Sequence, residues 1–123
     1  MQYGYIKVAA AIPAVKVADC HFNAEQTEQQ IRLANEQGAE IVVFPELGIT
    51  GYTCQDLFTQ QLLIEQAEQA VGSLLEKTQT LDIIAVVGVP VAVDSILLNC
   101  AVVFQRGRIL GIVPKTYLPN YSE

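Results

Sequence analysis

The 123-residue sequence has little positive charge, and this scarcity argues against two classes of partner. It contains seven Lys and Arg residues against thirteen Asp and Glu residues, so its formal net charge is −6. A nucleic-acid-binding surface needs clustered cations that displace counterions from phosphates. An anionic membrane surface makes a similar demand. We therefore expect neither nucleic acid nor a membrane surface as a partner.

Cysteine is also sparse, and several site motifs are missing. Cys20, Cys54 and Cys100 stand at irregular spacing without a CxxC motif, and the chain has one His. This pattern supports neither a disulfide framework nor a zinc site, so we expect no metal ion and a reducing, cytoplasmic location. No run approaches the ~20 apolar residues that span a bilayer. The phosphate-binding motifs GxxxxGK(S/T) and GxGxxG are absent, so we expect no cofactor in these residues.

Apolar residues, in contrast, are abundant. They make up 51% of the chain, and charged residues only 16%, which excludes a disordered chain. The length is that of one small domain, and a chain of this size leaves about a third of its unfolded-state surface exposed after folding. We therefore expect part of the apolar surface to be covered by a partner or by further chain.

Short apolar runs predict strands at 6–12, 40–44 and 83–89. The stretch from Val8 to Val15 favours a short buried strand over a signal peptide because it has no basic leader and is interrupted by Pro13. The second is a continuous β-branched run, which is typical of a strand buried on both faces, and Pro90 is expected to close the third. Two further runs, 96–104 and 108–114, flank a Gly-containing turn and predict a β-hairpin.

Two segments carry helical periodicity. The first is expected at 23–37, with Asn23 as its N-cap, Gln26 completing a variant of the capping box, and Gly38 just past its end. The second is expected at 59–77. The residues expected to face the core are Ile31 and Ala34 in the first helix and Leu63, Ala67, Ala70 and Leu74 in the second.

This order of elements predicts the fold class. Strands separated by helices pair in parallel and are covered by those helices, whereas the closing hairpin adds antiparallel strands. We therefore expect an α/β domain with a mixed sheet.

Two ionisable residues follow directly on predicted strands. Glu46 comes after the run ending at Phe44, and Lys115 comes after the run ending at Pro114. Ligands of such sheets bind beyond the carboxyl ends of the strands, where a charge in a partly dry pocket acts strongly. The alternative interpretation is that Glu46 caps a helix or is solvated, and that Lys115 is an ordinary cation at a strand end.

Two segments resemble those of a known family. The first, Phe44-Pro-Glu46-Leu-Gly-Ile-Thr-Gly-Tyr52 with Asp56-Leu-Phe58 after it, resembles the glutamate segment of the carbon–nitrogen hydrolase (nitrilase) superfamily. The second, from Asn99 to Glu123, resembles the lysine segment in the form found in the glutaminase domains of glutamine-dependent NAD(+) synthetases. The resemblance runs from Ile6 to the last residue. It implies the N-terminal part of an α-β-β-α sandwich, with the helices on one face of a mixed sheet.

The resemblance also implies a Glu–Lys–Cys triad. A cysteine thiolate would attack the carboxamide of glutamine and form a thioester. Glu46 would be the general base, and the ammonium of Lys115 would stabilise the oxyanion. Tyr52 and Tyr121, each six residues after one of these, would border the glutamine pocket; packing within a loop is the alternative for both.

The sequence departs from the family at the nucleophile, which the family places C-terminal of the lysine. No cysteine follows Lys115. Cys100 falls inside a predicted strand, Cys20 is interpreted as a surface neighbour of His21, and Cys54 stands at a helix start where the family has no nucleophile. We therefore expect residues 1–123 to be part of a glutamine amidohydrolase domain and to be inactive alone.

The complete protein would then be a ligase, a glutamine-hydrolysing NAD(+) synthase. Its expected partners are glutamine, the synthetase domain of the same protein, which would use ATP and Mg²⁺, and further copies in a homo-oligomer. Two alternatives stay open: another amidase of the nitrilase superfamily, and a non-catalytic α/β interaction module.

Overall fold

The computed structural model describes residues 6–16, 19–45, 48–49, 57–94 and 96–117, with the backbone alone at 57–60, 96–97 and 115–117. The helices and strands within these ranges are, in chain order, β1 (Val8–Ala10), α1 (Cys20–Glu36), β2 (Ile41–Val43), α2 (Leu57–Lys77), β3 (Ile84–Val93), β4 (Ile96–Gln105) and β5 (Arg108–Tyr117). The predicted order of strands and helices is confirmed.

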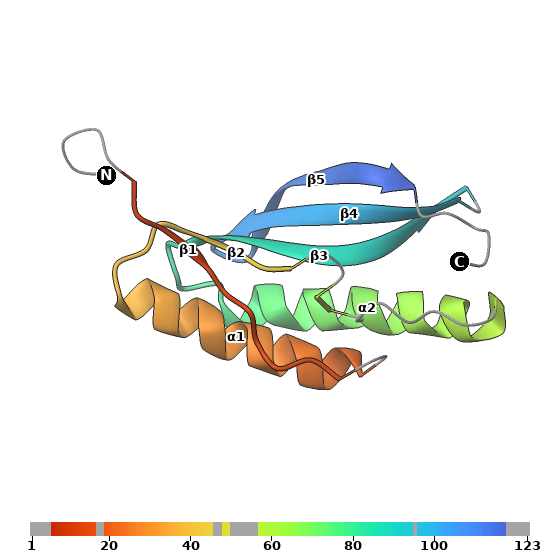
Figure 1. Ribbon diagram of the computed structural model, residues 1–123, viewed down its shortest axis with the longest axis horizontal. Helices are drawn as coiled ribbons and strands as arrows, with labels where there is room; N and C mark the ends of the chain where they lie inside the picture. Colours follow the sequence, from red (N-terminus) through yellow and green to blue (C-terminus); the bar gives the residue numbers. More distant parts are fainter. Residues whose placement is uncertain (1–5, 17–18, 46–47, 50–56, 95, 118–123) are drawn as a thin grey trace.

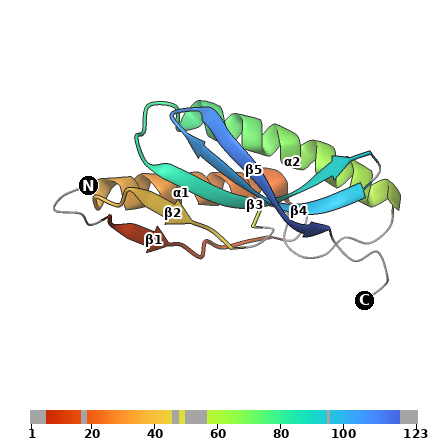
Figure 2. The same ribbon diagram turned by 90° about the horizontal axis from the view of Figure 1, so that it is seen from above.

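The strands form one mixed sheet in the order β1-β2-β3-β4-β5. The pairs β1–β2 and β2–β3 are parallel, and the pairs β3–β4 and β4–β5 are antiparallel. Both helices pack on the same face of this sheet (Figure 1), and the view from above shows them running beneath the strands (Figure 2). The predicted α/β class, with a mixed sheet and helices on one face, is confirmed.

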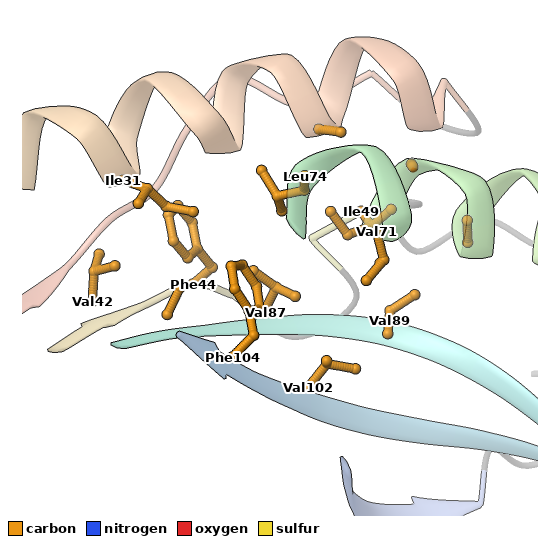
Figure 3. Close-up of a cluster of buried hydrophobic side chains, with 14 of the residues drawn as sticks. Ile31, Val42, Phe44, Ile49, Val71, Leu74, Val87, Val89, Val102 and Phe104 are labelled. Atoms are coloured by element: carbon orange, nitrogen blue, oxygen red, sulfur yellow. The ribbon is translucent and has the colours of Figure 1, made fainter. Parts of the chain in front are cut away.

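The core lies between the helices and the sheet face that they cover. Alternate residues of the strands reach this layer, and Ile31 of α1 and Leu74 of α2 meet them from the other side (Figure 3). All six helix positions that the periodicity predicted to be inward are buried. The strand side chains of the core include Val42, Ala85, Val87, Val89, Val102 and Phe104.

The opposite sheet face is apolar but has no covering layer within the described chain. In β2, Val42 is fully buried on the helix side, whereas Val43 is 40% exposed on the other side. Val43 aligns with Val86 and Val103 on neighbouring strands, so this face continues across the sheet. The prediction that 40–44 is buried on both faces is therefore wrong for this structure, because helices cover only one face.

Strand β3 continues through Pro90 instead of ending there. Pro90 aligns with Asn99 of β4. The carbonyls of Val86 and Gly88 accept hydrogen bonds on the β2 side, so the backbone groups of every second residue, Pro90 included, point to that side. The N–H that Pro90 lacks would point to the β2 side and not to β4, so no bond of the β3–β4 ladder is lost. On the β2 side no bond is lost either, because β2 ends opposite Val86.

Helix α1 begins one turn before the predicted position. The carboxylate of Asp19 accepts a hydrogen bond from the backbone N–H of Phe22 at 3.0 Å and caps the helix, so Asn23 is not the N-cap. The predicted helix end is confirmed. Gly38 has φ +86°, and Ala39 N–H bonds to the carbonyl of Ala34 at 3.0 Å, the pattern of a Schellman motif.

The predicted closing hairpin is confirmed as the connection of β4 and β5. Gln105 pairs with Arg108, and the two residues between them, Arg106 and Gly107, have φ values of 52° and 76°. These values are those of a type I′ turn, whose twist matches that of the paired strands. Within the described residues, neither helix combines the length and apolarity needed to cross a membrane.

Candidate functional site

The structure describes the side chain of none of the four predicted site residues. Glu46, Tyr52 and Tyr121 lie outside the described residues, so their roles stay predictions. Lys115 is described by its backbone, as part of β5. What the structure shows of the site is the backbone on either side of Glu46 and the register of β5.

The chain on both sides of Glu46 is anchored to β3. Before it, Phe44 N–H donates to the carbonyl of Val86 at 2.9 Å. After it, Ile49 N–H donates to the carbonyl of Gly88 at 3.2 Å. In a regular parallel ladder the Gly88 carbonyl would accept from the second residue after Phe44, so the chain leaves the ladder between these two bonds. Gly48 N–H also bonds to the carbonyl of Pro45 at 3.1 Å, which closes a turn within this segment.

Both anchors are buried as well as hydrogen-bonded. Phe44 and Ile49 are 7% and 1% exposed, and both side chains belong to the core (Figure 3). The carbonyl of Ile49 accepts a further bond from the side chain of Asn23, at 2.7 Å. The segment that contains Glu46 is therefore held to the sheet at its start and to the sheet and α1 at its end. Such fixed ends are what a catalytic carboxylate requires, since catalysis depends on its placement.

Lys115 is the extra residue of a β-bulge. Pro114 pairs with Cys100, whereas Thr116 pairs with Asn99, so Lys115 has no counterpart on β4. Bulges are over-represented beside active sites, where they redirect a side chain. The sequence showed that Lys115 follows an apolar run, but the bulge depends on strand register and could not be seen there.

The topology gives β2, which precedes Glu46, and β5, which contains Lys115, the same direction in the sheet. Strand β5 is antiparallel to β4, which is antiparallel to β3, so β5 runs in the direction of β2 and β3. The carboxyl ends of β2 and β5 therefore point in the same direction. Val43, the last residue of β2, aligns through Val86 and Val103 with Gly111 of β5, so β5 and Lys115 extend further in this direction than β2. Ligands of open α/β sheets bind beyond such carboxyl ends.

The two described cysteines are buried in positions that do not suit a nucleophile. Cys100 lies in β4 at 3% exposure, as the sequence predicted, and burial raises the pKa of its thiol. A raised pKa disfavours the thiolate, which is the reactive form. Cys20 is also 3% exposed, with its Sγ 4.0 Å from the carbonyl of Leu63, so its interpretation as a surface residue is wrong. Cys54 lies outside the described residues.

A separate groove lies on the helix layer. It has a volume of about 520 Å³ and is lined at the start of α1 by Asp19, Cys20 and His21, and along α2 by residues that include Gln66 and Gln69. Its lining includes no residue of β2 or β5. Among the described residues, no group of three His, Cys, Asp or Glu residues is placed to hold a metal ion.

The position of Asn23 differs from the predicted one. The sequence predicts an N-cap, yet Asn23 lies inside α1 and contacts the segment after β2. A signal was present: Asn23 is in phase with Thr27, Ile31 and Ala34, the buried stripe of the helix. A polar residue on such a stripe indicates a buried hydrogen-bonding role.

Comparison with known proteins identifies one family that the chain matches. Residues 7–123 match the model of the family described as carbon-nitrogen hydrolase. The chain is 37% identical over 122 residues to the glutamine-dependent NAD(+) synthetase of Mycobacterium tuberculosis strain H37Rv, covering 99% of this chain and 18% of that protein. It is 36% identical over 106 residues to the enzyme of that name from Aquifex aeolicus, again 18% of the relative's length.

Solved structures support the same relationship. The crystal structure of a glutamine-dependent NAD(+) synthetase from Cytophaga hutchinsonii matches 94% of this chain with a TM-score of 0.81 and 29% identity, over 20% of that chain. An amidase from Nesterenkonia sp. AN1, solved in complex with butyramide, matches 94% of this chain with a TM-score of 0.79 and 22% identity, over 45% of its own length. The latter shows the shared fold.

Proposed function

The chain belongs to the carbon–nitrogen hydrolase family, and we propose that it forms part of the domain that hydrolyses glutamine in a glutamine-dependent NAD(+) synthetase. The observation that carries the proposal is the identity of 37% over 99% of the chain with a relative of that name. The chain spans 18% of that relative's length, so we assign the proposed activity to the complete protein and not to these residues alone. The synthetase part of that protein would use ATP and Mg²⁺ outside these residues.

In the proposed reaction, a cysteine sulfur attacks the carboxamide carbon of glutamine and a C–S bond forms. Glu46 takes the thiol proton and passes it to the departing nitrogen, so the C–N bond breaks and ammonia leaves. Water then attacks the thioester, Glu46 takes a proton from the water and returns it to the sulfur, and glutamate is released. The ammonium of Lys115 stabilises the oxyanion in both steps. Tyr52 and Tyr121 would border the bound glutamine.

We place the nucleophile outside residues 1–123. Cys20 and Cys100 are buried in the core region, and the family resemblance assigns no nucleophile to the position of Cys54. A carboxylate and an ammonium without a thiolate provide no acyl acceptor, so the 123-residue chain by itself should not release glutamate from glutamine.

The test uses the complete protein and two nitrogen sources. Glu46→Gln should lower NAD formation from glutamine by at least the ~10²–10⁴-fold attributed to a general base, because Gln keeps the shape but cannot accept the proton. Lys115→Met should lower it by about 10²–10³-fold through loss of the oxyanion's counter-charge. NAD formation from saturating free ammonia should stay near wild type in both variants, because that route needs no glutamine hydrolysis.

Matched controls are Glu68→Gln and Lys77→Met, two exposed helix positions that should affect neither nitrogen source. If glutamine-driven synthesis survived Glu46→Gln and Lys115→Met, the interaction module would be the better interpretation. If the complete protein hydrolysed another carboxamide and formed no NAD, it would be a different amidase. Loss of activity in Cys54→Ala equal to that in Glu46→Gln would contradict our placement of the nucleophile.

A further inference from the structure

Asn23 joins three segments of the chain through its side chain. Its Oδ1 accepts a hydrogen bond from the backbone N–H of Lys16 at 2.8 Å. Its Nδ2 donates to the carbonyl of Lys16 at 2.8 Å and to the carbonyl of Ile49 at 2.7 Å. The side chain thus links α1 to the segment after β1 and to the segment that follows Glu46.

The three bonds use the donor capacity of the amide completely. Both Nδ2 hydrogens are engaged, and Oδ1 has an acceptor role, so the orientation of the amide is determined by its partners. Asn23 is 1% exposed, and its bond to the carbonyl of Ile49 is buried, whereas its two bonds to Lys16 are partly buried. A buried amide with every donor satisfied is a rigid connection.

This connection holds the C-terminal end of the segment that contains Glu46. Ile49, three residues after Glu46, has its N–H held by Gly88 of β3 and its carbonyl held by Asn23 of α1. Its side chain is 1% exposed. Loss of the Asn23 bond would leave the buried carbonyl of Ile49 without this partner and would free the end of the segment from the helix layer.

We propose that Asn23 is a positioning residue for Glu46: its side-chain amide fixes the backbone of Ile49, three residues after Glu46, and thereby one end of the segment that carries the carboxylate. The proposal rests on the proposed function, since it takes Glu46 as the general base. Asparagine is specifically suited to the position because it offers two donors and one acceptor in a fixed plane. Aspartate has the same shape, but an ionised carboxylate has no donor for the carbonyls of Lys16 and Ile49.

The experiment measures glutamine-driven and ammonia-driven NAD formation by the complete protein with Asn23→Asp and Asn23→Ala. We expect kcat with glutamine to fall at least tenfold while KM for glutamine changes little, because a displacement of about 1 Å at a catalytic group costs on the order of 10²-fold in rate. Ammonia-driven synthesis should remain at the wild-type level.

Thr27→Val is the matched control for a loss of stability. Thr27 is buried one turn further along α1, and its hydroxyl donates to the carbonyl of Asn23 at 2.8 Å within the helix. The substitution removes a buried hydrogen bond from the same helix without touching the Lys16 or Ile49 backbone. If Thr27→Val lowered kcat with glutamine as much as Asn23→Ala, the effect would be one of helix stability and the proposal would be overturned.

A double substitution separates this proposal from the proposed function. If Asn23 acts through Glu46, adding Asn23→Ala to Glu46→Gln should lower the residual glutamine-driven rate by less than twofold. A further tenfold loss would show that Asn23 acts independently and would overturn the proposal. If Glu46→Gln alone left the rate intact, the proposed function would fail; if Glu46→Gln abolished the rate but Asn23→Asp did not, only the positioning role would fail.

Discussion

At the scale of single residues, Gly107 is a position with little room for a side chain. It has φ +76°, and an added Cβ would lie 2.9 Å from Cβ of Gln79 and 3.2 Å from the carbonyl oxygen of Leu75. The β4–β5 turn thus approaches the end of α2 at backbone distance. Gly107→Ala should lower the free energy of unfolding by more than the ~1–2 kcal/mol of left-handed strain alone, because the clash with α2 adds to it.

Urea unfolding followed by circular dichroism measures this difference. Gly72→Ala is the control with the opposite expected sign: Gly72 lies in α2 with no atom within 4 Å of an added Cβ. Alanine there should stabilise the chain by about 0.5–1 kcal/mol through helix propensity. An equal effect of the two substitutions would contradict the close approach at Gly107.

At the scale of elements, the start of α1 depends on one side chain. Asp19 accepts the hydrogen bond of Phe22 N–H at 3.0 Å, and its negative charge lies at the positive end of the helix. Asp19→Ala should lower the free energy of unfolding by about 1 kcal/mol, the usual cost of a lost N-cap. Asp19→Asn retains an acceptor and should lose a few tenths of that value. The same urea titration distinguishes the two, and equal losses in both variants would contradict a capping role.

At the scale of the whole molecule, the uncovered sheet face is the main feature. Val8, Val43 and Val113 are 58%, 40% and 55% exposed on the side away from the helices. An apolar face of this kind favours association with another surface. We expect the 123-residue chain to bind a hydrophobic dye and to form oligomers, as detected by dye fluorescence and light scattering.

Charged substitutions show which surface binds the dye and mediates association. Val43→Lys with Val113→Lys should reduce dye binding and association severalfold, whereas Leu33→Lys should not. Leu33 is equally apolar and 46% exposed, but it lies on α1. A wild-type chain that is monomeric and binds no dye would contradict this account of the high apolar content.

Part of the fold could be predicted from the sequence because the signals that specify it are local. The spacing of Ile31 and Ala34 marked the buried face of α1, Gly38 marked its end, and Arg106-Gly107 marked the hairpin. Each of these follows from periodicity or turn chemistry within a few residues.

Other features were decided by the tertiary structure alone, because each of them depends on contacts between segments that are not adjacent in the sequence. Asn23 has the right chemistry for a cap, but Asp19 takes that role and Asn23 instead bonds to segments that only the fold brings to it. Pro90 is compatible with β3 because β2 has already ended on the side to which its N–H would point. Lys115 lies in a β-bulge because of the register between β4 and β5. This register could not be predicted from either strand by itself.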